Sequence, residues 1–222
     1  MYLPQQTSLI VSGLTELGLF GACFYSATPY STNEKYAKIR HPYSDLDFLY
    51  FTNISLYLTL LTVVIGIIYR YKKSFSSIYN VLLPMALSLE IIVTIMFWSL
   101  YMIDPALIKN KNSLLPGYET PIITELGQHL FPVILLSINQ RQMKIIYHKF
   151  QTLAFITLLI IWYTVVTIIA HQRGKYIYRF MSEIKNDQTR FALFCLFIAI
   201  AYLIHRTYIK IKARSSSSKN SK

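Results

Sequence analysis

The chain has 222 residues, of which 54% are hydrophobic and only 14% are charged, and its mean hydropathy is +0.39. A soluble domain carries about 25% charged residues, so this composition excludes an ordinary soluble protein and favours one that lies in a membrane. The net charge of +12 does not indicate nucleic-acid binding. The basic residues sit in connections and a tail beside apolar runs, where we expect contact with anionic headgroups.

Six apolar stretches are each long enough to cross a hydrocarbon core of about 30 Å as an α-helix. We therefore predict an all-α integral membrane protein, in which residues 1–214 form one bundle of six transmembrane helices. In chain order, the predicted spans are 7–26, 48–69, 78–103, 121–140, 152–170 and 190–209. The first stretch is predicted to be a span and not a signal peptide, because neither a basic region nor an early cleavage site of small residues accompanies it. Residues 215–222 are rich in Ser, Lys and Asn and are predicted to form a disordered basic tail.

Six spans would place both ends of the chain on the same side of the membrane. The basic residues divide almost evenly between the two sides, which is a weak signal under the positive-inside rule. All the acidic residues of the connections fall on the side opposite the termini: Glu34, Asp45, Asp47, Asp104, Glu119, Glu183 and Asp187. We therefore predict that both termini are cytosolic.

Ionisable side chains interrupt the apolar spans at Glu16, Glu90, Glu125 and His129. An ionisable group in hydrocarbon costs several kcal/mol, so it usually faces the bundle interior and marks a site or a pathway. At about 1.5 Å per residue, Thr52 and Glu125 would lie roughly 6 Å inside the non-cytosolic end, and His129 roughly 12 Å inside. On the same scale Glu16 would lie at roughly 15 Å, within the same polar chamber, and Glu90 at roughly 20 Å, as a structural partner. The remaining histidines lie near span ends or in connections and are predicted to be interfacial: His41, His148, His171 and His205.

A stripe of hydroxyl side chains follows one face of the second predicted span. Thr52, Ser55, Thr59 and Thr62 are separated by offsets of 3, 4 and 3, which places them on one side of a helix. One interpretation is a packing stripe, since small hydroxyl residues are common where transmembrane helices meet. The other is that Thr52, at the end of the stripe, is a reactive hydroxyl.

Glu125 and His129 are four residues apart and share a helical face. A carboxylate one turn from an imidazole can fix its tautomer and raise its basicity, which a general base requires. The alternative is a structural hydrogen bond that only joins helices. A hydroxyl, an imidazole and a carboxylate at similar depth are the parts of a hydrolase with an activated nucleophile, and Asn53 and Gln128 are candidate hydrogen-bond donors to its oxyanion.

Four segments carry a resemblance to a known family. They are FLYFTNISL at 48–56, FWSLYMIDPALI at 97–108, Gln128-His129 with Pro132, and GKYIYRF at 174–180. In this order they resemble the androgen-induced / androgen-dependent TFPI-regulating family of six-span membrane hydrolases. The resemblance implies a threonine hydrolase of the endoplasmic reticulum that cleaves fatty acid esters of hydroxy fatty acids. It implies Thr52 as the nucleophile and His129 as its partner.

The sequence departs from the family pattern around these residues: Pro105 and Ala106 replace an acidic stretch, Gln128 replaces Asn, Arg179 replaces Pro, and Leu130 and Phe131 replace polar residues. Three hypotheses stay open. The first is an intramembrane hydrolase that needs no metal or cofactor and whose partners are the bilayer and a long-chain lipid or fatty-acyl ester. The second is a proton-coupled transporter with Glu16, Glu90 and Glu125 as relay sites, although the chain lacks the internal repeat typical of transporters. The third is a non-catalytic membrane scaffold of the same family.

Overall fold

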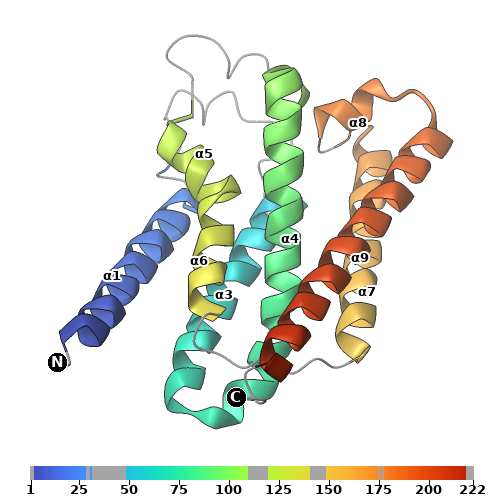
Figure 1. Cartoon of the computed structure of the whole chain (residues 1–222). Helices are drawn as coiled ribbons and strands as arrows, with labels where there is room; N and C mark the ends of the chain where they lie inside the picture. The colour runs from blue at the N-terminus through green and yellow to red at the C-terminus, as the bar shows by residue number, and fades with distance from the viewer. Residues whose placement is uncertain are drawn as a thin grey trace.

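The protein is a bundle of helices that run alternately up and down (Figure 1). The computed structural model describes residues 3–28, 31, 49–109, 120–140, 149–174, 176 and 178–218, and no strand occurs among them. The long helices are α1 (Leu3–Ser26), α3 (Phe51–Tyr71), α4 (Ser76–Ile103), α5 (Ile122–His129), α6 (Phe131–Asn139), α7 (Lys149–Arg173) and α9 (Asp187–Ser218). The short helices are η3 (Lys73–Phe75), η4 (Pro105–Leu107) and α8 (Arg179–Glu183).

The bundle has the helices of an integral membrane protein. Four of the described helices, α3, α4, α7 and α9, are long and apolar enough to cross a membrane, and α5 with α6 makes a fifth if the bent pair is one span. The prediction of an all-α membrane protein is therefore confirmed for the described residues. Each predicted span coincides with a helix or, for 121–140, with a helix pair. The count of six membrane crossings is not confirmed, because only four of the described helices, or five with the bent pair, are long and apolar enough to cross a membrane.

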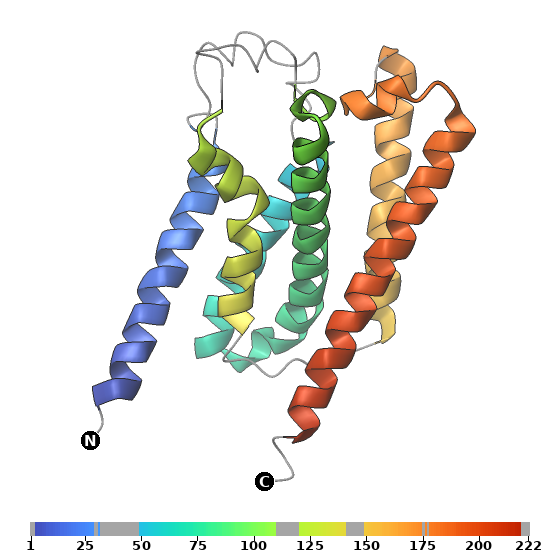
Figure 2. The same cartoon turned by 45° about the horizontal axis from the view of Figure 1, so that its top comes forward.

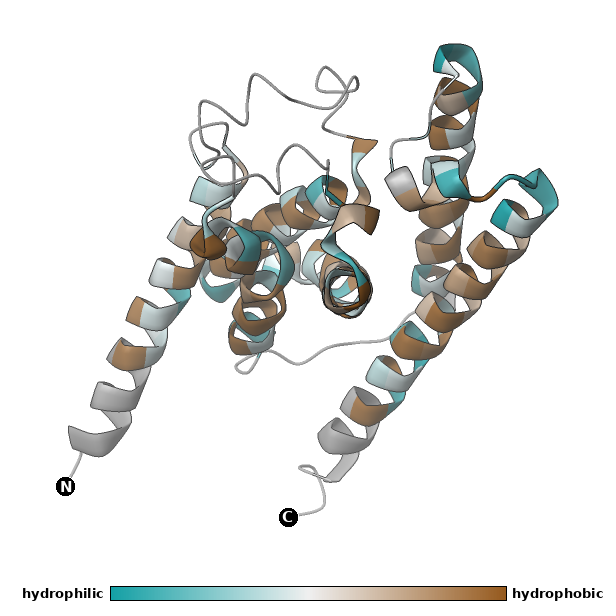
Figure 3. Ribbon diagram, turned by 90° about the horizontal axis from the view of Figure 1, so that it is seen from above, coloured by the Kyte–Doolittle hydropathy of each residue, from teal (hydrophilic) through white to brown (hydrophobic). Residues whose placement is uncertain are grey.

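Helix α4 is the central helix of the bundle. Its buried residues lie on all sides, as expected for a helix that is apolar all round, and α3, α6 and α9 pack against it. Helix α1 lies at one flank and the α7–α9 pair at the other (Figure 2). Brown, hydrophobic segments make up much of the ribbons of α7 and α9 (Figure 3), and both helices expose hydrophobic side chains such as Leu153 and Leu203. Such faces are suited to contact with lipid.

Two prolines shape the interior. Pro132 has no N–H to donate to the carbonyl one turn earlier, and the fourth predicted span breaks just before it, at Leu130, with a bend of 45° between α5 and α6. Pro84 lies inside α4 and leaves the carbonyl of Asn80 without its helical partner. The side chain of Gln151 on α7 donates to that carbonyl at 2.9 Å. The carbonyl that Pro84 leaves free in α4 thus forms a hydrogen bond that joins α4 to α7.

Helix α9 differs from the sequence-based expectations at two points. His205 was predicted to be interfacial, but it is fully buried, with its Nδ1 3.0 Å from the Ser88 hydroxyl oxygen and its ring 4.7 Å from that of Phe155. The prediction failed because His205 faces α4, where polar partners are available near Pro84. The backbone of α9 is helical to Ser218, so the first part of the predicted disordered tail 215–222 continues the helix. The predictions for His41, His148 and residues 219–222 lie outside the described residues.

Candidate functional site

The four segments that carry the family resemblance meet at one end of the bundle. Helix α3 begins within the first segment, α4 ends within the second, α5 ends within the third, and the fourth leads into α8. In Figure 1 these points lie toward the upper end, away from the start of α1 and the end of α9. Side chains far apart in the sequence therefore come together around the ends of α4 and α5.

His129 is the last residue of α5 and is 5% exposed. Its ring stacks on Phe97 of α4 with centroids 3.4 Å apart and planes 9° apart. The Thr94 hydroxyl, one turn earlier on α4, donates to the His129 carbonyl oxygen at 2.6 Å. This bond satisfies a backbone acceptor at the break between α5 and α6, where helical partners are missing. Both the ring and the backbone of His129 are therefore held by α4.

Glu125 lies between His129 and a lysine. Its Oε2 is 3.6 Å from His129 Nε2, which is longer than a hydrogen bond but close enough for strong electrostatic attraction. Its Oε1 is 2.5 Å from Lys109 Nζ, and the two side chains are only 8% and 13% exposed. The ammonium also lies 5.1 Å from the centre of the Tyr101 ring. The lysine compensates the buried carboxylate, which otherwise would be costly to keep ionised.

The second ring nitrogen of His129 has no partner among the residues that the structure describes. Its Nδ1 is buried and makes no hydrogen bond within the described part of the chain, whereas most buried polar atoms are satisfied. With Nε2 turned toward Glu125, the tautomer protonated at Nε2 leaves Nδ1 as a free acceptor. This arrangement can take up a proton from a group that approaches Nδ1.

Thr52 lies in the first turn of α3 and is half-buried. The Tyr178 hydroxyl accepts the Phe51 backbone N–H at 2.7 Å, and both the backbone N–H and the side chain of Thr52 interact with the same oxygen. Helix α3 packs against α5, which carries His129. No hydrogen bond joins Thr52 to His129 among the described residues. The structure thus brings Glu125 and His129 into contact, and places Thr52 on a neighbouring helix with Tyr178.

The two predicted oxyanion donors differ in their surroundings. Asn53 follows Thr52 in the first turn of α3 and is half-buried. Gln128 donates its side-chain amide to the Ser26 carbonyl at 2.7 Å, and so ties α5 to the end of α1. Its neighbour Thr124 makes a similar link, from its hydroxyl to the Ser31 carbonyl at 2.9 Å. Gln128 therefore serves the contact between α1 and α5 in this structure.

Glu16 lies away from the other predicted site residues. Its carboxylate accepts from Arg70 Nη2 at 2.7 and 2.8 Å and from the Asn139 amide, at the far ends of α3 and α6. Tyr79 completes this cluster by donating to Asn139 Oδ1 at 2.6 Å. Ten residues of helix separate Asn139 from His129, about 15 Å along the axis. The prediction that Glu16 shares a chamber with His129 is therefore wrong. Depth along the helix did not account for the attraction of Arg70, whose side chain extends into the bundle and pairs with Glu16.

Glu90 is fully buried at the centre of the bundle, as expected for a structural partner. Its Oε1 accepts the Thr59 hydroxyl at 2.8 Å, which joins α3 to α4. Ser55 and Thr62 are buried on the same face of α3, and Thr62 donates to the Leu58 carbonyl at 2.7 Å. This part of the hydroxyl stripe packs against α4, and Thr52 at its end contacts Tyr178 instead.

Three side chains around the site were not singled out from the sequence. Lys109 was counted only as a charge in a connection, Phe97 only as part of a motif, and Tyr178 only as part of the segment before the last span. Their positions within the resembling segments, or directly after one, were the available signal. Among the described residues no group of three or more His, Cys, Asp or Glu side chains could hold a metal ion.

Comparison with known proteins gives one match. The family model described as FAR-17a/AIG1-like protein matches residues 13–212. No curated protein and no solved structure matches the chain. The match covers α3 to α8 whole, together with most of α1 and α9, and includes all four segments that resemble the androgen-induced family. The chain therefore belongs to the FAR-17a/AIG1-like family, the androgen-induced gene 1 family of membrane proteins.

Proposed function

We propose that the protein is an intramembrane hydrolase of long-chain lipid esters, with Thr52 as the nucleophile and His129 as the base. By resemblance, the substrates are fatty acid esters of hydroxy fatty acids. The partners in this proposal are the surrounding bilayer and a fatty-acyl ester that enters sideways from it. Glu125 is proposed to hold the imidazole in the tautomer that leaves Nδ1 free.

One observation carries the proposal: the buried imidazole of His129 has a carboxylate 3.6 Å from one nitrogen and, among the described residues, no hydrogen-bond partner at the other. Most buried polar atoms are satisfied. His205 also has an unpartnered nitrogen, and His129 differs from it in the carboxylate beside its other nitrogen. The surroundings support the same interpretation, because Phe97 fixes the ring plane and Lys109 pairs with Glu125 at 2.5 Å. Hydrogen bonds between a nucleophile and its base are often long before substrate binds and shorten in the complex, so Thr52 need not touch His129 in the free protein.

The proposed reaction proceeds through an acyl-enzyme. Thr52 Oγ1 attacks the ester carbonyl carbon while its proton passes to His129 Nδ1, and the carbonyl electron pair moves onto oxygen. The tetrahedral adduct collapses, the bond to the alkoxy oxygen breaks, and His129 returns the proton to the leaving alcohol. A water molecule then gives its proton to His129 and attacks the acyl-threonine, which releases the fatty acid and restores the Thr52 hydroxyl.

Ester cleavage by purified variants tests the proposal. We expect Thr52→Ala and His129→Ala to abolish hydrolysis of a fluorogenic long-chain ester in detergent micelles, because they remove the nucleophile and the base. Thr52→Ser should retain activity, since it keeps a hydroxyl in the same place. Full activity in Thr52→Ala, with unchanged expression and unfolding temperature, would contradict the proposed nucleophile.

We also propose the endoplasmic reticulum as the site of action, with both termini cytosolic. The alternating course of the helices supports this topology, because α1 begins and α9 ends at the same end of the bundle (Figure 2). Epitope tags at both ends of the chain should be reached by antibodies after the plasma membrane alone is permeabilised. A tag that becomes accessible only after all membranes are permeabilised would contradict this orientation.

A proton-coupled carrier is the second candidate function, favoured by the burial and the hydrogen bonding of Glu90. This carboxyl group is fully buried in the bundle, and its Oε2 has no hydrogen-bond partner among the described residues. Buried ionisable groups in spans are typical of proton pathways. Reconstituted vesicles with an internal pH dye distinguish the two functions: a carrier predicts proton movement that Glu90→Gln abolishes, and the hydrolase predicts none.

A further inference from the structure

Tyr178 contacts the proposed nucleophile from a different part of the chain. It precedes α8 in the connection between α7 and α9, and its hydroxyl reaches the start of α3. The residue before the helix, Tyr50, offers no side-chain cap to α3, so the Tyr178 oxygen takes that role by accepting the Phe51 N–H at 2.7 Å. The side chain of Thr52 interacts with the same oxygen.

The hydrogen bonds at this contact leave the phenol proton available. A tyrosine hydroxyl has one proton to donate and also accepts. Its oxygen accepts from the backbone N–H of Phe51 at 2.7 Å, and the interactions with the backbone and the hydroxyl of Thr52 lower its pKa, as hydrogen bonds donated to the oxygen do. The phenol proton can therefore be donated to an acceptor that arrives beside Thr52. Because backbone N–H groups polarise the phenol, they strengthen it as a donor.

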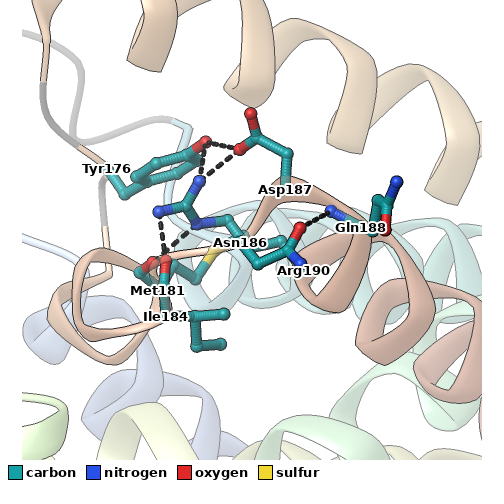
Figure 4. A network of polar contacts seen from close by, with 7 residues as sticks. All are labelled: Tyr176, Met181, Ile184, Asn186, Asp187, Gln188 and Arg190. Atoms are coloured by element: carbon teal, nitrogen blue, oxygen red, sulfur yellow. Dashed lines mark hydrogen bonds and ion pairs between the residues drawn. The ribbon is translucent and has the colours of Figure 1, made fainter.

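The segment that carries Tyr178 is held firmly. Arg190 at the start of α9 donates to the Met181 carbonyl at 2.9 Å and to the Tyr176 hydroxyl at 3.0 Å, and also to the Ile184 carbonyl and Asp187 (Figure 4). Its guanidinium lies 4.3 Å from the centre of the Tyr176 ring. One arginine therefore ties together both sides of α8, the short helix that directly follows Tyr178.

The other side of the contact is fixed as well. Trp162 of α7 donates to the Leu49 carbonyl at 2.8 Å and its ring lies 4.8 Å from that of Phe51. The Tyr50 ring meets Tyr178 edge-on at 5.5 Å. The start of α3 and the segment before α8 are thus both anchored to α7 or α9, which preorganises the contact between Thr52 and Tyr178.

We propose that Tyr178 is a catalytic residue that donates its phenol hydrogen bond to the ester carbonyl oxygen as Thr52 attacks. This inference rests on the proposed function, since it needs Thr52 to be the nucleophile. In the free protein the phenol oxygen lies at the start of α3, beside Thr52. When Thr52 Oγ1 bonds to the ester carbonyl carbon, the negative charge moves to the adjacent carbonyl oxygen, and the Tyr178 hydroxyl donates its hydrogen bond to that oxygen. The first turn of α3 adds the positive end of a helix at the same place.

The surroundings of Tyr178 keep its hydroxyl protonated, as a donor must be. Burial is the main cause that raises the pKa of Tyr178 above its ordinary value, and the hydrogen bonds from Phe51 and Thr52 oppose this rise only in part. The titratable group that faces it is the Tyr50 ring, and no charged side chain is among its described contacts. The donor is therefore expected to survive throughout the neutral and mildly alkaline range.

Removal of the hydroxyl is the direct test. Tyr178→Phe should lower kcat by about 10²–10³-fold, as expected when one oxyanion donor is lost, with little change in KM. Trp162→Phe is the matched control, because it also removes an anchoring hydrogen bond to the start of α3 but does not touch Thr52. We expect both variants to lower the unfolding temperature, and only Tyr178→Phe to lower kcat. Equal kcat losses in the two variants would overturn the proposal in favour of a purely structural cap.

A fluorinated side chain keeps the test informative even if Tyr178→Phe fails to fold. Replacement of Tyr178 by 3-fluorotyrosine retains the hydroxyl and the cap but makes the phenol a stronger acid. The phenol then donates a stronger hydrogen bond while it stays protonated at neutral pH, so kcat at neutral pH should rise with little change in KM. An unchanged kcat would overturn the proposal. Two outcomes are distinguishable. Full activity of Thr52→Ala would contradict the proposed function itself. Full activity of the Tyr178 variant together with an inactive Thr52→Ala would contradict only the role of Tyr178.

Discussion

Replacement of Glu125 by Gln removes the negative charge that lies between Lys109 and His129. The ion pair with Lys109 is short, at 2.5 Å, and its side chains are 8% and 13% exposed, so solvent screens it little. Loss of one partner of a buried pair leaves the other charge uncompensated and costs about 3–5 kcal/mol. We therefore expect Glu125→Gln to lower the free energy of unfolding by about that amount, measured by chemical unfolding in detergent micelles.

The same substitution should also slow catalysis. A carboxylate 3.6 Å from the imidazole stabilises the imidazolium by about 5 kcal/mol at an effective dielectric of about 20. The positive charge of Lys109 opposes this effect from the other side of Glu125, so we expect kcat to fall by roughly 10²-fold, equivalent to about 3 kcal/mol. Hydrolysis of a fluorogenic long-chain ester by the purified variant measures this loss.

A double variant separates the two effects. In Glu125→Gln/Lys109→Met no uncompensated charge remains, so most of the lost stability should return, as it does when a buried ion pair is replaced as a unit. Activity should stay low, because His129 still lacks its carboxylate. If activity returns together with stability, Glu125 serves only to hold the fold, and its proposed action on the imidazole is wrong.

Three further predictions concern contacts at the end of α5 and at the far end of the bundle. A Cβ at Gly66 would lie 2.5 Å from a buried amide oxygen, so Gly66→Ala should lower the free energy of unfolding by about 1–3 kcal/mol. Gly13→Ala is the control, because a Cβ there would meet nothing within 4 Å. In the same unfolding assay this variant should leave the free energy of unfolding unchanged or raise it. Thr94→Val leaves the carbonyl at the end of α5 unpaired and should lower the free energy of unfolding by about 1–3 kcal/mol, with faster amide hydrogen exchange in α5. Equal exchange in the variant and the wild type would contradict the proposed role of this bond. Arg70→Met leaves the buried Glu16 carboxylate without its cation and should cost about 3 kcal/mol, and Glu16→Gln in addition should restore part of the loss of unfolding temperature; no restoration would show that the two do not form a pair.

The helices were predictable from the sequence because long apolar runs leave few alternatives. Each predicted span coincides with helix, and the membrane character follows from hydropathy alone. Where the fourth span bends was not predictable, although Pro132 indicated a weak point. The broken backbone is stabilised by the Thr94 hydroxyl from another helix, and such long-range partners are not visible in a linear sequence.

The candidate site was predictable only for pairs of residues on one helix. The contact between Glu125 and His129 followed from a spacing of four residues, whereas Lys109 and Tyr178 reach the site from connections whose course no periodicity predicts. For Glu16 the prediction was wrong. Its depth suggested the same chamber, but the pairing with Arg70 at the other end of α3 decides its place. Depth along a span is a guide to position only when the charged partners are also known.

The most direct measurement of the central claim is the mass of the acylated protein. Purified protein would be mixed with a long-chain ester, quenched in acid within one turnover and digested, and the peptides sequenced by mass spectrometry. We predict one acyl group on Thr52, which disappears in His129→Ala. An acyl group on another hydroxyl, such as Ser88 beside His205, or rapid ester cleavage with no adduct in either protein, would contradict the account.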